Sequence, residues 1–150
     1  TNAPEIQATG GDTNIDIKLV PKGTGIVKGT LHRFAIRLVD SATDVATGTS
    51  IGGDFRISNR AITIKAVGAY NDTAGTTGTM TIDINEAGST IMTTNKITID
   101  STEKTSETAA TAYGLTDTAI AADGIITIDV DAVHTTKAKG LVVWIDYVYA

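Results

Sequence analysis

The stretches TMTIDIN (79–85) and IITIDVDAV (125–133) decide the fold, because apolar and polar side chains alternate along both of them. A repeat of two residues is the period of a β-strand. A strand with one apolar and one polar face is typical of an antiparallel sheet whose outer face is in water. The same alternation recurs in three further stretches, HRFAIRLV (32–39), AITIKAV (61–67) and NKITID (95–100).

The segments between these strands are rich in glycine, asparagine, aspartate and threonine, which favour turns. Residues 101–115 are the only stretch that could be helical, but the threonines there favour a long irregular connection with one helical turn. Many short strands joined by such turns predict an all-β fold. We expect an antiparallel, jelly-roll-like β-sandwich over residues 30–150, preceded by a short N-terminal β segment, residues 1–29.

The composition excludes several classes of protein. The chain has 150 residues, 41% of them hydrophobic, which is enough for one folded domain. Its net charge of −5 argues against nucleic-acid binding. The absence of cysteine rules out disulfides and thiol chemistry. No apolar run approaches the roughly 20 residues of a membrane-spanning helix. No motif predicts a catalytic centre, a cofactor or a metal site.

The last stretch, GLVVWIDYVYA (140–150), is apolar on both faces. Its inner face should belong to the core. Its other face carries Val142, Trp144 and Val148. Two explanations remain open for these three residues, because exposed apolar patches usually mark an interface. Either other parts of the same chain cover them, or they contact another subunit.

The stretch DTNIDIKLVPKGTGIVKG (12–29) contains a lysine, a threonine and two glycines that suggest a phosphate-binding loop. A P-loop has its lysine directly after the last glycine and is followed by a helix. Here Lys22 precedes Gly23, and the chain continues in strand-like alternation. We therefore interpret PKGTG (21–25) as a corner between two strands.

Two segments resemble parts of bacteriophage virion proteins. The first resembles a recurring element of phage fibres and tailspikes and is carried by Asn14, Ile15, Ile17, Leu19, Pro21, Lys22, Gly23, Thr24, Gly25 and Val27. The second resembles a β-sandwich module of virion proteins and is carried by Ile82, Asp83, Ile84, Asn85, Gly88, Ile91, Ile97, Ile99, Asp100, Thr105, Asp123, Gly124, Ile128 and Asp129. Residues 31–70 belong to neither resemblance.

The resemblance implies a non-enzymatic structural protein of the virion, either a fibre or a capsid decoration (head fibre) module. Such a protein acts by forming a homotrimer, and its further partners are other capsid or tail proteins. Attachment to a host surface is an additional role that the resemblance allows. Val142, Trp144 and Val148 are then the candidate subunit interface.

The alternative is a glycan-binding module, either at the tip of a fibre or in a secreted protein. Aromatic residues beside polar loop residues are suited to sugar binding. Tyr70, Asn71, Asp72 and Tyr113 are the candidates for that contact.

Two further groups of polar residues have the side chains that metal binding or catalysis would use. Asp83 with Asn85, and Asp129 with Asp131, could begin a calcium site, but a solvated strand face explains them better. The two histidines lack the sequence context of a catalytic triad. We expect His32 to be a partly buried structural residue and His134 to be solvated in a turn.

Overall fold

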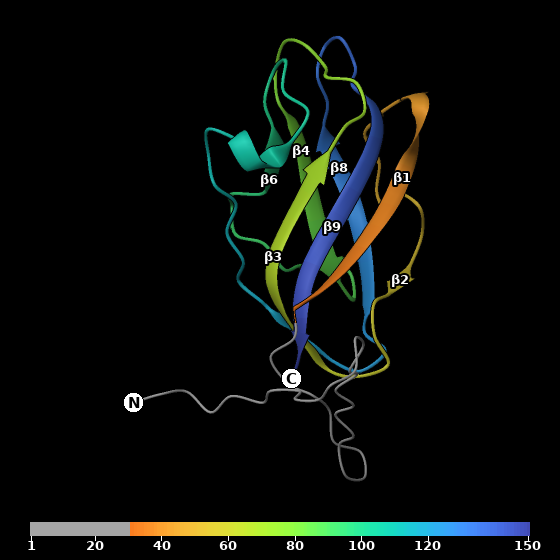
Figure 1. Cartoon of the computed structure of the whole chain (residues 1–150), viewed down its shortest axis with the longest axis vertical. Helices are drawn as coiled ribbons and strands as arrows, with labels where there is room; N and C mark the ends of the chain where they lie inside the picture. Colours follow the sequence, from red (N-terminus) through yellow and green to blue (C-terminus); the bar gives the residue numbers. More distant parts are fainter. Residues whose placement is uncertain (1–30) are drawn as a thin grey trace, which may run out of the picture.

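The computed structural model describes residues 31–150, which form nine strands and one short 3₁₀ turn (Figure 1). The segment 1–29, with its PKGTG corner, lies outside the described residues. In chain order the elements are β1 (His32–Asp44), β2 (Phe55–Arg56), β3 (Ile62–Tyr70), β4 (Met80–Glu86), β5 (Ser89–Thr90), β6 (Ile97–Ile99), η1 (Ser106–Thr108), β7 (Ala119–Ile120), β8 (Ile125–Ala132) and β9 (Lys139–Tyr149). Among these elements there is no helix long and apolar enough to cross a membrane.

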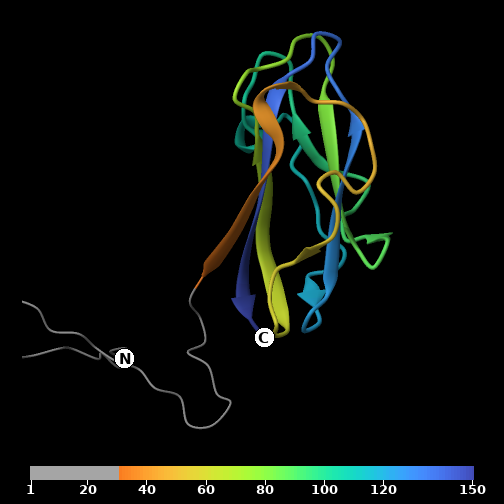
Figure 2. The same cartoon turned by 90° about the vertical axis from the view of Figure 1, so that its right-hand side faces the viewer.

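The strands form two antiparallel sheets that pack face to face (Figure 2). One sheet has the order β1-β9-β3-β7, and the other has the order β2-β8-β4-β5, with β6 also paired to β4. The first and last strands therefore lie side by side, and the chain passes repeatedly from one sheet to the other. This is the topology of a double-sheet jelly roll. The predicted all-β sandwich is confirmed.

The core lies between the two sheets and consists mainly of isoleucine. The apolar faces of the stretches 79–85 and 125–133, over residues 80–84 and 126–130, are at most 2% exposed, as the alternation predicted. Fully buried side chains include Met80, Ile82, Ile84, Ile97, Ile99, Ile126 and Ile128. Isoleucine suits these positions because its branched side chain fits the pleated surface of a strand.

Strand β9 lies in the interior of its sheet, between β1 and β3, with its inner face on the core and with Arg33 over Trp144 on its outer face. Leu141, Val143 and Ile145 point into the core and are at most 1% exposed. Central strands lose their hydrogen-bonding edges to neighbours and most of their surface to packing. The outer face of β9 carries Val142, Trp144 and Val148, the three candidates for a subunit interface.

Strand β1 contains a large bulge near its end. Val39 pairs with Leu141 and Asp44 with Lys139, so four residues of β1 lie opposite the single residue Gly140. Gly140 has a φ of +64°, a backbone conformation that glycine adopts at low cost. The bulge bends the end of β1 away from a regular ladder.

The connection 101–115 contains one turn, η1, as predicted. It also completes the edge of β3 that β7 leaves free. The backbone N–H of Ala69 donates to the Ser106 hydroxyl over 2.9 Å, and the N–H of Val67 donates to the Tyr113 hydroxyl over 3.1 Å. The side chains of this connection thus take the place of a neighbouring strand.

Candidate functional site on the outer face of the four-stranded sheet

The outer side of the sheet β1-β9-β3 carries the one tryptophan of the chain together with two arginines. We call this surface the Trp144 face. Strand register places its residues side by side. It consists of Arg33, Ala35 and Arg37 of β1, Val142, Trp144 and Asp146 of β9, and Gly68 and Tyr70 of β3.

The indole of Trp144 lies flat across the neighbouring strand. It covers Gly68, where a Cβ atom would stand only 2.2 Å from Cζ2 of the indole. On the opposite side Trp144 is paired with Ala35, another small residue. The small residues on both neighbouring strands make room for the ring, and Trp144 remains partly exposed.

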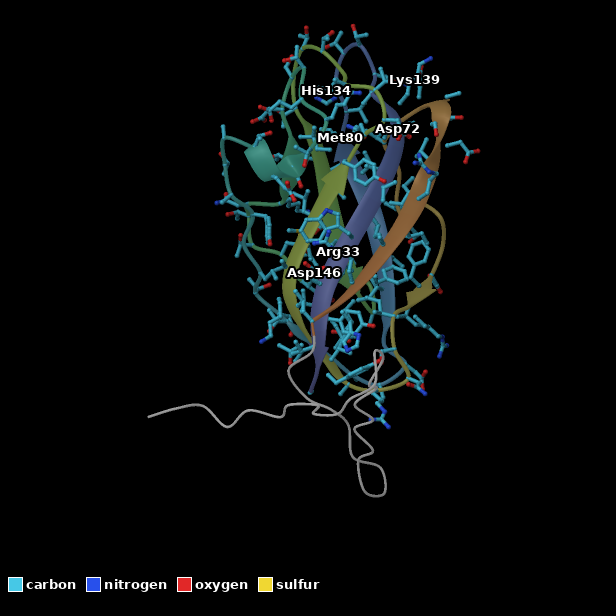
Figure 3. All side chains as sticks on the ribbon, in the orientation of Figure 1. Arg33, Asp72, Met80, His134, Lys139 and Asp146 are labelled. Atoms are coloured by element: carbon cyan, nitrogen blue, oxygen red, sulfur yellow. The ribbon has the colours of Figure 1, made fainter. Side chains whose placement is uncertain are left out.

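Arg33 covers the indole from above. Its guanidinium carbon is 4.2 Å from the ring centroid, which is the geometry of a cation–π contact. The same guanidinium donates two hydrogen bonds to Asp146, over 2.6 and 2.8 Å. These hydrogen bonds hold the pKa of Asp146 below its ordinary value, although burial of the carboxylate opposes the shift. Figure 3 shows Arg33 and Asp146 together at the centre of this face.

A second arginine–aspartate pair lies at the other end of the face. Arg37 donates to both carboxylate oxygens of Asp72, and these hydrogen bonds lower the pKa of Asp72. Beside this pair the side chain of Tyr70 is 40% exposed, which is unusual for a large apolar residue in this protein. Asp146 and Asp72 are therefore each paired with an arginine. Trp144 lies beneath the first pair, and Tyr70 lies beside the second.

The four candidates for glycan contact are not all presented to solvent. Tyr70 and Asp72 lie at the surface, as just described. Asn71 is only 2% exposed, and its amide lies over the sulfur of Met80. Tyr113 packs against the core, and its hydroxyl holds the edge of β3. The structure thus brings together two of the four candidates.

The three candidates for a subunit interface lie on the outer side of β9, as predicted. Val142 is only 6% exposed, because neighbouring residues of the same chain already cover it. Trp144 and Val148 are half-buried. The chain itself therefore covers Val142, and contact of Trp144 and Val148 with another subunit stays a prediction.

The outer face of the other sheet holds an extended polar network rather than a solvated row of acids. Asp83 is only 4% exposed, and it accepts a hydrogen bond from the Thr90 hydroxyl over 2.6 Å. The ammonium group of Lys96 binds Asp83 and also Asp131. The prediction of a wet face is wrong at Asp83. Lys96 lies where a cation would have to bind, and the described residues contain no group of three or more potential metal ligands.

The two histidines differ in environment. His32 is partly buried and stacks on Tyr147, with ring centroids 5.4 Å apart, as expected of a structural residue. His134 is 1% exposed, so the prediction of a solvated side chain is wrong. Its loop folds back over the end of the sandwich, where Gly75 packs directly against the imidazole. Within residues 31–150, the imidazole of His134 contacts the backbone carbonyl of Asp100 over 3.3 Å, and neither histidine hydrogen-bonds to a serine or aspartate side chain.

The sequence did not single out Arg33, Arg37 or Gly68, which give the Trp144 face its form. The alternation in 32–39 does place both arginines on the outer side of a strand. Which residues they meet depends on the pairing of β1 with β9, which are more than 100 residues apart in the chain. Comparisons with protein-family profiles, with curated protein sequences and with solved structures gave no match.

Proposed function

We propose that this protein is a non-enzymatic structural component of a virion, a fibre or capsid decoration module, and that it acts by assembling into a homotrimer. The Trp144 face is the surface through which the jelly rolls meet. The observation that carries this proposal is the partly exposed indole on the outer face of the sheet, flanked by two arginines and an exposed tyrosine.

The chemistry of this face supports a contact between proteins. Tryptophan, tyrosine and arginine are the residues that most often dominate the energy of protein interfaces. The charges of Arg33 and Arg37 are already balanced by Asp146 and Asp72, so packing a second copy on this face buries no unpaired charge.

The topology supports the same class of function. Double-sheet jelly rolls occur in viral capsid domains, and also in lectins and cupins. A fold alone does not determine a function. The resemblance of residues 14–27 and 82–129 to phage virion segments is what selects the virion among these possibilities.

The proposal is tested by placing a charge at the centre of the Trp144 face. Ala35 is exposed and pairs with Trp144, so Ala35→Glu places a charge at the centre of the face, and circular dichroism checks that the variant subunit is folded. Ser89→Glu is the matched control, because Ser89 is also an exposed strand residue but belongs to the other sheet. Size-exclusion chromatography with light scattering should show a trimer for the control and smaller species for Ala35→Glu. Equal masses for the two variants would show that the Trp144 face takes no part in trimer assembly.

A second candidate function is glycan binding, and the exposure of Tyr70 favours it. Its ring stands beside the Arg37–Asp72 pair, so one apolar and several hydrogen-bonding groups lie within one small area. Sugars are bound by such combinations of an aromatic ring and polar groups. A glycan array probed with the natural chain and with Tyr70→Ala tests this function. Binding that the substitution abolishes supports it, whereas an array with no signal rejects it for the glycans displayed.

A further inference from the structure

A groove lies at the edge of the sandwich, where the chain leaves β1 and crosses to the second sheet. Its volume is about 330 Å³. Apolar side chains form the floor, namely Leu38, Val39, Ala46 and Ile51. Thr43 and the two carboxylates Asp40 and Asp44 form the wall. It is separate from the Trp144 face, because Leu38 points to the opposite side of β1 from Arg37.

The wall of the groove is held in position by the fold. It is the bulge of β1, which is anchored at its end by the fully buried Val45, whose N–H donates to the carbonyl of Ala138 over 2.9 Å. Underneath, Gly140 lets the bulge approach closely, since a Cβ there would stand 3.1 Å from Cα of Ser41. Bulges often serve to direct side chains toward a binding site.

The charges of the groove are only partly balanced. Among residues 31–150, no basic group lies within 4.0 Å of Asp40. Asp44 has one cation nearby, Lys139, whose Nζ is 3.9 Å from the carboxylate, too far for a hydrogen bond. Both carboxylates are exposed. Lys139 and Asp72 lie at this same end of the molecule (Figure 3).

We propose that this groove binds a basic side chain of a partner protein, a lysine or an arginine. An apolar floor beside two carboxylates is complementary to a side chain that has an aliphatic stem and a cationic end. Lysine and arginine bury their stems on apolar surfaces while the charged group stays near water. A metal ion would lack the further ligands that it requires, and a purely apolar group would leave the carboxylates unpaired. The inference goes beyond the proposed trimer, since it assigns a contact with a different protein.

The test uses Nα-acetyl-lysine N-methylamide as the probe and the norleucine analogue as the matched control, which has the same stem without the ammonium group. Each is titrated into the isotopically labelled full chain, and backbone amide shifts are followed by NMR. The lysine probe should shift the amides of Leu38, Val39, Ala46 and Ile51 with millimolar affinity, and the norleucine analogue should bind at least several-fold more weakly. Higher salt should weaken the lysine probe only.

Protein variants complete the experiment. Asp40→Asn with Asp44→Asn should weaken binding of the lysine probe about fivefold, because each exposed ion pair contributes a factor of about two or more. Asp123→Asn should not change it, since Asp123 is exposed at another turn and its positive φ of +58° suits asparagine. Equal binding of the two probes, or unchanged binding in the double variant, would overturn the proposal. The oligomeric state of the double variant, measured in parallel, reports on the trimer independently.

Discussion

Replacing Gly68 by alanine should disrupt the Trp144 face and destabilise the protein. The new Cβ would stand 2.2 Å from Cζ2 and 2.5 Å from Cε2 of Trp144. Ordinary contact begins at 3.4 Å, so the indole must move by about 1.2 Å away from β3. It then loses its position beneath Arg33.

The expected loss of unfolding free energy follows from two opposing effects. Forcing an extra methyl group into a packed site costs about 1–3 kcal/mol. Alanine is better than glycine in a strand interior by about 0.5–1 kcal/mol, because the unfolded chain loses less entropy. The net destabilisation should be about 1–2 kcal/mol. Urea unfolding followed by fluorescence measures it directly, because Trp144 is the only tryptophan of the chain.

A double-mutant cycle shows whether the indole is the cause. In a Trp144→Ala background the same glycine substitution meets no ring, so it should become neutral or stabilise the protein by about 0.5 kcal/mol. Circular dichroism replaces fluorescence for this pair of variants. Equal destabilisation by Gly68→Ala in both backgrounds would show that the indole does not cause the loss of stability. The close packing of Trp144 on β3 would then be wrong.

Three further predictions concern the charges and the bulge. Lys96→Met should cost about 2 kcal/mol in urea unfolding, since it leaves the buried Asp83 carboxylate without a cation; an unchanged midpoint would contradict the network. The pKa of Asp146 is lowered in the folded state, so its pairing with Arg33 stabilises the protein above the ordinary value of 3.8 and is lost as the pH falls below it. The difference in unfolding free energy between the natural chain and Asp146→Asn should therefore shrink from pH 6 to pH 2, and a constant difference would argue against the pair. Gly140→Ala should destabilise the chain by about 1–3 kcal/mol in thermal unfolding, because its φ is +64° and the Asp72 carboxylate and the bulge leave no space for a Cβ; a tolerated alanine would contradict this backbone conformation.

Much of the fold follows from local patterns in the sequence. The alternation in 79–85 and 125–133 predicted which residues are buried, since a period of two assigns every second side chain to one face. The absence of helical spacing predicted the single turn in 101–115. The apolar pattern of 140–150 predicted a strand covered on both faces, but it left open whether the same chain or another subunit covers the outer face.

The parts that sequence reasoning missed depend on contacts between distant residues. Asp83 is expected in water from its alternation, but Lys96 and Thr90 cover it only after the strands have paired. The sequence predicted a solvated polar turn at His134, but the turn pairs with the loop at Thr77 and His134 is buried. The Trp144 face requires the pairing of the first and last strands, which no local pattern specifies.

The measurement that tests the central claim most directly is the native mass of the full chain by sedimentation equilibrium over a wide range of concentrations. Assembly through the Trp144 face predicts three times the chain mass of 15.5 kDa, independent of concentration. A mass of 15.5 kDa at every concentration would contradict the homotrimer and leave the Trp144 face as a surface covered only by its own arginine.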